Sequence, residues 1–199
     1  MSDTLKIAII PSTTRPGRFA DKPMAWIRDM MDARPDMQAE IVDLRDHPLP
    51  FFDETAPLSA KPAENAAALE WDAKLKGYDG FVVVLAEYNH SLPAVLKNAL
   101  DYGFEGWKHK PVGAVAYGGS GGSRALEHLR LVAINLRMVP VGGAVHIGGG
   151  DFMAAAKGGE LPAHLEPSAR GLLDEVAWWA AASRDKRRTA VRAQAPAAE

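Results

Sequence analysis

The fold of this chain is decided by the stretch Gly80-Phe-Val-Val-Val-Leu-Ala-Glu-Tyr-Asn-His-Ser-Leu-Pro93. Residues 81–86 are apolar at every position and rich in β-branched side chains, which predicts a strand buried on both faces, as in a parallel sheet. Pro93 then opens a predicted helix over residues 94–102. The polar residues 87–91 therefore follow the carboxyl end of a buried strand, which is where open α/β sheets bind their ligands.

This polar segment has the chemistry to bind a flat heterocycle that forms hydrogen bonds. Tyr88 offers an aromatic face for stacking, and Asn89 and Ser91 offer hydrogen-bond donors and acceptors. A simple polar strand end before a helix would account for Pro93, but it would not account for a tyrosine between a glutamate and an asparagine. We therefore expect a ligand at this segment.

Composition places the chain among ordinary globular proteins. Its 199 residues are enough for one well-buried core, and 47% of them are hydrophobic and 24% charged. We predict a single domain over residues 1–185. Residues 186–199 are basic and then rich in alanine and proline, which predicts a disordered tail.

Charge and cysteine content argue against several functional classes. The formal net charge of −2 gives no reason to expect a nucleic acid or a membrane surface as a partner. The chain has no cysteine and its six histidines show no close ligand spacing, so we expect no metal site. The first residues lack the basic and apolar regions of a signal peptide, and together with the lack of cysteine this predicts a cytoplasmic protein.

Strand-like and helix-like segments alternate along the chain. The predicted strands cover residues 5–10, 39–44, 81–86, 112–117 and 139–147. The predicted helices cover residues 20–34, 63–76, 94–102, 123–137 and 161–184, and residues 148–159 read as a glycine-rich loop. This alternation predicts an α/β fold: a flavodoxin-like three-layer α/β/α sandwich with a five-stranded parallel sheet in the order 2-1-3-4-5. Its ligand loops would follow strands one, three and four.

The loop after the first predicted strand, residues 11–18, reads Pro-Ser-Thr-Thr-Arg-Pro-Gly-Arg. Hydroxyls, backbone N–H groups and two guanidinium groups converge there on a helix N-terminus, whose dipole favours anions. Because arginine matches the oxygens of a phosphate monoester, we expect this loop to bind phosphate. A capped helix with two solvated arginines is the alternative. The loop matches neither the Walker A pattern nor the dinucleotide fingerprint.

The loop after the fourth predicted strand has four glycines around Ser120. Such a loop lets the backbone approach a ligand and direct N–H groups at it, although a flexible tight turn is an alternative. The segment also matches the Gly-x-Ser-x-Gly nucleophile elbow, and Asp151 and His164 follow in the order of a hydrolase triad. A serine hydrolase that uses Ser120 is therefore a rival hypothesis, but it leaves the other two loops without a role.

The chain resembles the NADPH-dependent FMN reductase family, a flavodoxin-like group that includes quinone, azo-dye and chromate reductases. The resemblance extends to the fifth predicted strand. It rests on the loop at 12–18, on Glu87-Tyr88-Asn89 through Pro93, on Leu96-Lys-Asn-Ala-Leu-Asp101, on residues 107–111 and on the glycine loop at 118–122. The chain departs from the family pattern at Pro11, where glycine is usual, and at Ala86, where proline is usual.

The resemblance implies a role for each loop. The first would hold the phosphate of FMN through Ser12, Thr13, Thr14, Arg15 and Arg18. The second would line the ribityl chain and one side of the isoalloxazine ring through Glu87, Tyr88, Asn89 and His90. The third would meet the pyrimidine edge of the ring through Gly118, Ser120, Gly121 and Gly122.

The implied activity is that of an FMN-dependent NAD(P)H oxidoreductase. Hydride would pass from NADPH or NADH through FMN to a quinone, flavin, azo compound or similar small-molecule acceptor in a ping-pong scheme, which requires no catalytic nucleophile. The family also implies a homodimer or homotetramer, and Phe51 and Phe52 fit either the core or such a contact. A flavodoxin-type electron carrier is the second alternative, but such carriers are strongly acidic and this chain is not.

Overall fold

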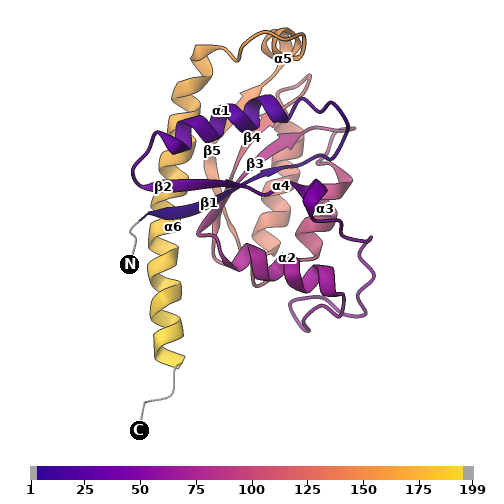
Figure 1. The fold of residues 1–199 in the computed structure, drawn as a ribbon, viewed down its shortest axis with the longest axis vertical. Coiled ribbons are helices and arrows are strands. Elements are labelled where there is room, and N and C mark those ends of the chain that lie inside the picture. The colour runs from indigo at the N-terminus through magenta and orange to yellow at the C-terminus, as the bar shows by residue number, and fades with distance from the viewer. Residues whose placement is uncertain (1–3, 195–199) are drawn as a thin grey trace.

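The structure, a computed structural model, describes residues 4–194. Its parallel strands form one sheet in the order β2-β1-β3-β4-β5 (Figure 1). The strands are β1 (Leu5–Pro11), β2 (Met37–Ile41), β3 (Gly80–Ala86), β4 (Pro111–Tyr117) and β5 (Val139–Ile147). The predicted flavodoxin-like α/β fold and strand order are therefore confirmed. The second strand begins and ends a few residues earlier than the sequence predicts.

Helices cover both faces of the sheet and complete the predicted three layers (Figure 1). One face carries α1 (Asp21–Asp32) and α6 (Glu166–Gln194). The other face carries α2 (Ala66–Lys76), α3 (Ala94–Asp101) and α4 (Ser123–Asn135). Among the helices of residues 4–194, none combines the length and the apolar character needed to span a membrane.

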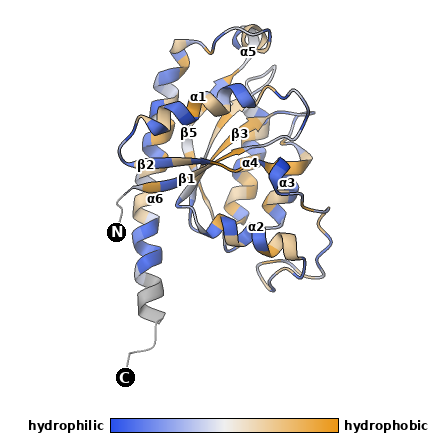
Figure 2. Cartoon of the chain, in the orientation of Figure 1, coloured by the Kyte–Doolittle hydropathy of each residue, from blue (hydrophilic) through white to orange (hydrophobic). Residues whose placement is uncertain are grey.

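The central strand β3 is buried along its whole length, as its sequence predicts. Its side chains alternate between the two cores: Val83 and Leu85 pack with α2, α3 and α4, whereas Val82 and Val84 pack with α1 and α6. Figure 2 shows the consequence, with hydrophobic residues concentrated on the strands. Burial on both faces fixes the register of β3, so the polar residues after Ala86 must emerge at the carboxyl edge of the sheet.

Two segments differ from the sequence prediction. Residues 148–159, expected to be a glycine-rich loop, contain the helix α5 (Gly149–Ala156), whose Phe152 ring packs 5.0 Å from that of Phe19. Helix α6 continues to Gln194, so residues 186–194 extend a helix where a disordered tail was predicted. The remainder of that predicted tail, residues 195–199, lies outside the described residues. Both differences arise because packing and helix continuity outweigh local composition.

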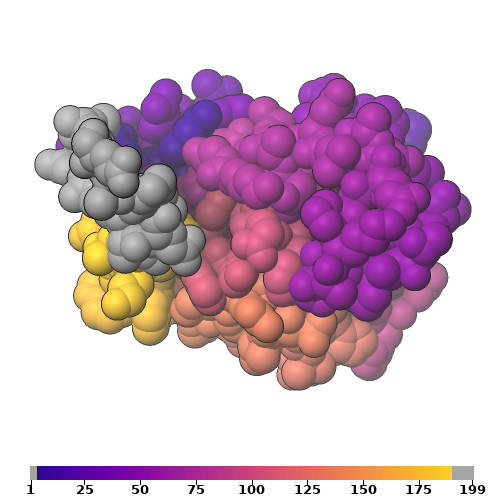
Figure 3. Space-filling model, turned by 90° about the horizontal axis from the view of Figure 1, so that it is seen from below, coloured from indigo at the N-terminus to yellow at the C-terminus, as the bar shows by residue number. Residues whose placement is uncertain are grey.

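The long segment between β2 and α2 lies at the opposite end of the molecule from α6 (Figure 3). It contains the short 3₁₀ turn η1 (Leu44–Asp46), and a second such turn, η2 (Ala163–Leu165), precedes α6. Phe51 on this segment is 84% exposed and Phe52 is 39% exposed, so neither belongs to the core.

Candidate active site

The structure brings the three predicted ligand loops together at the carboxyl edge of β1, β3 and β4. The Ser12 hydroxyl accepts a hydrogen bond from the backbone N–H of Ala86 at 2.8 Å, which ties the first loop to the end of β3. The hydroxyls of Thr13 and Tyr88 are 2.8 Å apart and tie the first loop to the second. The second and third loops are joined by an ion pair between Glu87 and Arg124.

Some polar side chains of the first loop are buried and have protein partners, whereas others are exposed. Ser12 and Thr13 are buried, and both hydroxyls have the protein partners described above. Thr14 and Arg15 are exposed, and the Arg15 guanidinium forms no ion pair with any residue between 4 and 194. The loop ends at Ala20, which begins α1 without a side-chain cap. In the first turn of α1 the Lys22 N–H already bonds the Phe19 carbonyl at 3.1 Å and Pro23 has no N–H, so the donors for an anion lie in the loop itself.

Arg18 is held inside the protein and is not presented to the loop surface. Its side chain has no exposed area, and its guanidinium donates to both carboxylate oxygens of Asp43, to Asp21 and to the Thr13 carbonyl. Burial would raise the pKa of Asp43, but the hydrogen bonds from Arg18 and Arg45 outweigh it and hold that pKa well below its usual range. Arg18 therefore stabilises the conformation of the first loop from the protein interior.

The second loop is a tight turn that projects its tip out of the sheet. Backbone hydrogen bonds join Tyr88 N to Ser91 O at 2.9 Å and Ser91 N to Tyr88 O at 3.1 Å. Asn89 and His90 between them both have positive φ, +48° and +75°. Positive φ is uncommon for residues other than glycine, although asparagine and histidine adopt it more often than most. The turn leaves residue Tyr88 36% exposed, as a ligand-stacking role requires.

The third loop depends on glycine for its close approach to β4. Gly122 has a φ of +69°, and a Cβ atom there would lie 2.7 Å from the backbone N of Tyr117. Gly121 also has positive φ, and the His146 ring lies 2.9 Å from its carbonyl oxygen. Gly119 and Ser120 are exposed at the tip, next to the second loop. The loop is therefore shaped by its own packing and exposes its tip to a ligand.

Arg124 is a site residue that the sequence analysis missed. Its backbone N–H donates to Glu87 at 3.2 Å, and its guanidinium pairs with Glu87 and donates to Ser120 Oγ at 2.8 Å. The Glu87 side chain is 5% exposed, so its carboxylate is directed into this network. A basic residue in the first turn of a helix, two positions after a glycine loop, is the signal that could have indicated it.

Several backbone N–H groups on the three loops have no hydrogen-bond partner within residues 4–194. They belong to Thr13, Thr14 and Gly17 in the first loop, to Asn89 and His90 in the second, and to Gly119 and Ser120 in the third. Neighbouring free N–H groups form a concave donor surface that suits phosphate oxygens and the acceptor atoms of a heterocycle. The loops therefore fit a phosphorylated flavin such as FMN.

The structure does not assemble the hydrolase triad. Asp151 and His164 do form a pair, with 3.0 Å between Oδ2 and Nε2. The Ser120 hydroxyl instead accepts from Arg124, and no hydrogen bond joins it to His164 within the described residues. Without a base within hydrogen-bonding reach, Ser120 has no activation as a nucleophile.

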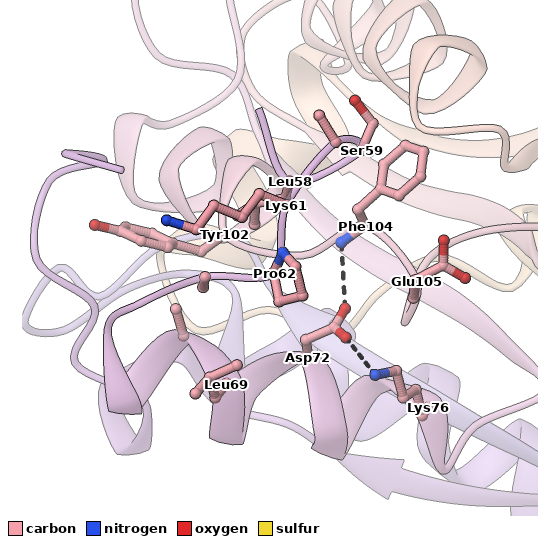
Figure 4. A pocket seen from close by; sticks show the side chains of 13 residues that line it. Leu58, Ser59, Lys61, Pro62, Leu69, Asp72, Lys76, Tyr102, Phe104 and Glu105 are labelled. Atoms are coloured by element: carbon pink, nitrogen blue, oxygen red, sulfur yellow. Dashed lines mark hydrogen bonds and ion pairs between the residues drawn. The ribbon is translucent and has the colours of Figure 1, made fainter. Parts of the chain in front are cut away.

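A separate cavity of about 290 Å³ lies between α2 and the residues that follow α3 (Figure 4). Its wall contains Leu58, Tyr102 and Phe104, and its polar side is formed by Asp72 and Lys76. These two charges pair at 2.7 Å, and the Asp72 carboxylate also accepts from the Phe104 N–H at 3.2 Å. Because its polar groups already have structural partners, this cavity adds no chemistry to the three loops.

The fold and the three loops define a flavodoxin-like protein with an edge site for a phosphorylated heterocycle. The chain belongs to the NADPH-dependent FMN reductase family, whose pattern it matches over residues 5–151. It is therefore an FMN-dependent NAD(P)H oxidoreductase, which confirms the class of enzyme and the cofactors that the sequence predicts.

Individual relatives agree with this membership. An NAD(P)H-dependent FMN reductase of Schizosaccharomyces pombe is 37% identical over 139 residues, which are 68% of this chain and 68% of the relative. An NAD(P)H-dependent FMN reductase of Saccharomyces cerevisiae is 30% identical over 152 residues, 70% of this chain and 78% of the relative. The solved structure of the flavoenzyme NAD(P)H:(acceptor) oxidoreductase FerB from Paracoccus denitrificans shares the fold, with a TM-score of 0.70 and 21% identity over 89% of this chain and 97% of that one.

Proposed function

We propose that the three loops bind FMN and that the protein passes reducing equivalents from NAD(P)H through FMN to a small-molecule acceptor in a ping-pong scheme. The observation that carries this proposal is the set of free peptide N–H groups on the three loops, next to the exposed ring of Tyr88. Phosphate oxygens and the acceptor atoms along the edge of a flavin ring can take these donors.

The structure supports a division of labour in the first loop. Arg15 and Thr14 are exposed, and their side chains have no hydrogen-bond or ion-pair partner in the described part of the chain, so we assign the phosphate contact to them and to the neighbouring N–H groups. Ser12, Thr13 and Arg18 already bind other parts of the protein. We therefore assign them to the shape of the loop, which narrows the set of phosphate ligands expected from the sequence.

The other two loops would hold the ring. Tyr88, Asn89 and His90 would line one side of it, and the backbone of 118–122 would meet its pyrimidine edge. Glu87 would act indirectly, by positioning Arg124, because its carboxylate already pairs with that residue. Free N–H groups at the pyrimidine edge would stabilise negative charge there, as an oxyanion hole does.

Bound FMN supplies the hydride chemistry, and the protein supplies orientation and electrostatics. A ring exposed on one face lets NAD(P)H and then the acceptor occupy the same place in turn. Quinones, flavins and azo compounds are the acceptors we propose. The NAD(P)H that drives the cycle is a cytoplasmic reductant, and we propose that location for the enzyme.

We further propose that the protein is a homodimer or homotetramer. Leu131 and Ile134 on α4 are 67% and 62% exposed, and a groove of about 440 Å³ with a largely apolar lining runs beside them against α3. Apolar side chains gathered in this way favour a protein contact, and a second copy of the chain would bury them. Light scattering on purified protein measures the mass directly, and a monomer would refute this part.

The test of the proposed function is spectroscopic. Purified protein is expected to be yellow, or to become so on titration with FMN, and to oxidise NADPH or NADH when a quinone is added. A colourless protein that does not bind FMN would refute the proposal. Flavin binding without steady NAD(P)H oxidation would favour the electron carrier.

A further inference from the structure

His90 stands at the rim of the three-loop site in a backbone conformation that suits glycine better. It occupies the second central position of the turn that joins Tyr88 to Ser91, with a φ of +75°. Tight turns of this type favour Asn-Gly at their two central positions, and this chain has Asn89 followed by histidine. The turn places the imidazole on the exposed tip of the second loop.

The ring of His90 is oriented by Arg124. Arg124 Nη1 lies 3.3 Å from His90 Nδ1. Because a guanidinium can only donate hydrogen bonds, Nδ1 must accept, and the neutral ring then carries its proton on Nε2. This Nε2–H has no hydrogen-bond partner among residues 4–194, and the His90 side chain is exposed.

Arg124 is in turn fixed by the second and third loops of the site. Its guanidinium pairs with the nearly buried Glu87 carboxylate and donates to Ser120 Oγ at 2.8 Å. The hydrogen-bond network from Glu87 through Arg124 to His90 therefore leaves one oriented donor, His90 Nε2–H, at the edge of the three-loop site. A second imidazole lies nearby. The ring centroids of His128 and His90 are 6.3 Å apart, and His128 Nδ1 is 2.7 Å from Ser91 Oγ.

We propose that His90 Nε2–H donates a hydrogen bond to an oxygen of a quinone-type acceptor during its reduction. This inference rests on the proposed function and names the class of acceptor. Reduced FMN, when bound, would supply a hydride to one quinone oxygen, which would become an O–H group, while the displaced electron pair would leave the other oxygen as a phenolate. The His90 donor stabilises that anion, which then takes a proton from water to complete the hydroquinone. No proton leaves His90, which acts only as a hydrogen-bond donor.

The tautomer can be tested apart from turnover. Nitrogen-15 NMR of the full-length protein, flavin-free and FMN-loaded, is expected to show His90 protonated on Nε2 with Nδ1 as acceptor. In Arg124→Gln the guanidinium donor is lost, and the His90 Nδ1 signal is expected to shift, whereas that of His164, which pairs with Asp151 elsewhere, stays in place. A His90 ring protonated on Nδ1 in the unaltered protein would overturn the inference.

The acceptor preference is tested with His90→Gly, a substitution that removes the ring and suits the backbone of the turn. Ferricyanide takes single electrons without forming a bond at a carbonyl oxygen, so it is the matched reference acceptor. The ratio of kcat/KM for 1,4-benzoquinone to that for ferricyanide is expected to fall at least tenfold in His90→Gly and to be partly restored in His90→Gln, which has an amide donor.

An unchanged ratio in His90→Gly would show that His90 serves the turn alone and would overturn the inference. Titration of the same proteins with FMN keeps this outcome separate from the proposed function. A yellow enzyme that reduces ferricyanide but shows no change in the ratio contradicts the inference alone. Failure of the unaltered protein to bind FMN contradicts the proposed function.

Discussion

Replacing Asp43 with asparagine would break the buried ion pair that holds the first loop. The substitution keeps the shape of the side chain and removes its charge, while the Arg18 side chain opposite has no exposed area and Asp43 itself is 10% exposed. Arg18 would then be left as a buried guanidinium with one carboxylate partner fewer. Removing one partner of a buried pair is far more damaging than removing both, because the remaining charge has lost its compensation.

The magnitude follows from the contacts that are lost. Two charge-assisted hydrogen bonds run from Arg18 to the two carboxylate oxygens. The asparagine Oδ1 can still accept one of these bonds, but its NH2 group faces a guanidinium donor in place of the other, so the roughly 3–5 kcal/mol expected for breaking a buried pair applies. For a protein of this size, each kcal/mol lowers Tm by about 2–4 °C, so Asp43→Asn is expected to lower Tm by roughly 10 °C.

Urea unfolding followed by circular dichroism measures this loss, and FMN titration measures its effect on the loop. Arg45→Gln is the matched control, since Arg45 binds the same carboxylate from a side chain that is 50% exposed, where solvent screens the pair. A much smaller loss is expected there. The double substitution Arg18→Met with Asp43→Leu should recover stability but not FMN affinity, because the Arg18 bond to the Thr13 carbonyl is lost.

The same pair gives a signed pH dependence. The pKa of Asp43 is lower in the folded protein than in the unfolded chain, so its contribution is complete above the unfolded pKa of about 3.9 and is lost as the pH falls below it. The difference in unfolding free energy between the unaltered protein and Asp43→Asn should therefore shrink in acid. A loss below about 1 kcal/mol at neutral pH, or a difference that does not depend on pH, would refute the reasoning.

Three further predictions concern single residues. Arg15→Ala should weaken FMN binding by about 1.5–3 kcal/mol in a titration and leave Tm unchanged, because the side chain is exposed and has no ion pair within residues 4–194; a lowered Tm would assign Arg15 a structural role instead. Gly122→Ala should destabilise the protein by roughly 1–3 kcal/mol in urea, because its Cβ would lie 2.7 Å from the Tyr117 backbone N at positive φ. Burial lowers the pKa of Lys110 to about 7, so the free energy of unfolding should rise by roughly 2–4 kcal/mol from pH 7 to 10 as the amine loses its charge in the folded state first. That rise should be absent in Lys110→Met, and an equal slope in both proteins would contradict it.

The parts of the fold that the sequence predicts are those with a strong local signal. The apolar run at 81–86 predicts a doubly buried strand, and β3 is buried throughout. A strand buried on both faces belongs in the interior of a parallel sheet that helices cover on both sides. The strand order and the position of the ligand loops follow from this. The glycines at 121 and 122 likewise indicate a turn with positive φ, and both residues adopt it.

The parts that the sequence could not predict depend on partners far away in the chain. Arg18 reads as a free phosphate ligand until the fold places Asp43 beside it, 25 residues on. Arg124 reads as an ordinary helix residue until Glu87, 37 residues earlier, meets it. In segment 148–159 the glycines obscured α5, whose Phe152 is stabilised by contact with Phe19 and Tyr117. In each case a tertiary contact determines the role of the residue or the structure of the segment, which local composition alone does not.

Helix α6 has a consequence for how the protein is made. Its Leu172 and Val176 cover one face of the sheet, and Arg184 reaches back to the Thr4 carbonyl at 3.2 Å. During translation α6 leaves the ribosome after all five strands of the sheet, so the apolar surface of those strands stays uncovered until α6 emerges. Nascent chains that stall before α6 would expose that surface, and they are the species that chaperones and proteases would have to recognise.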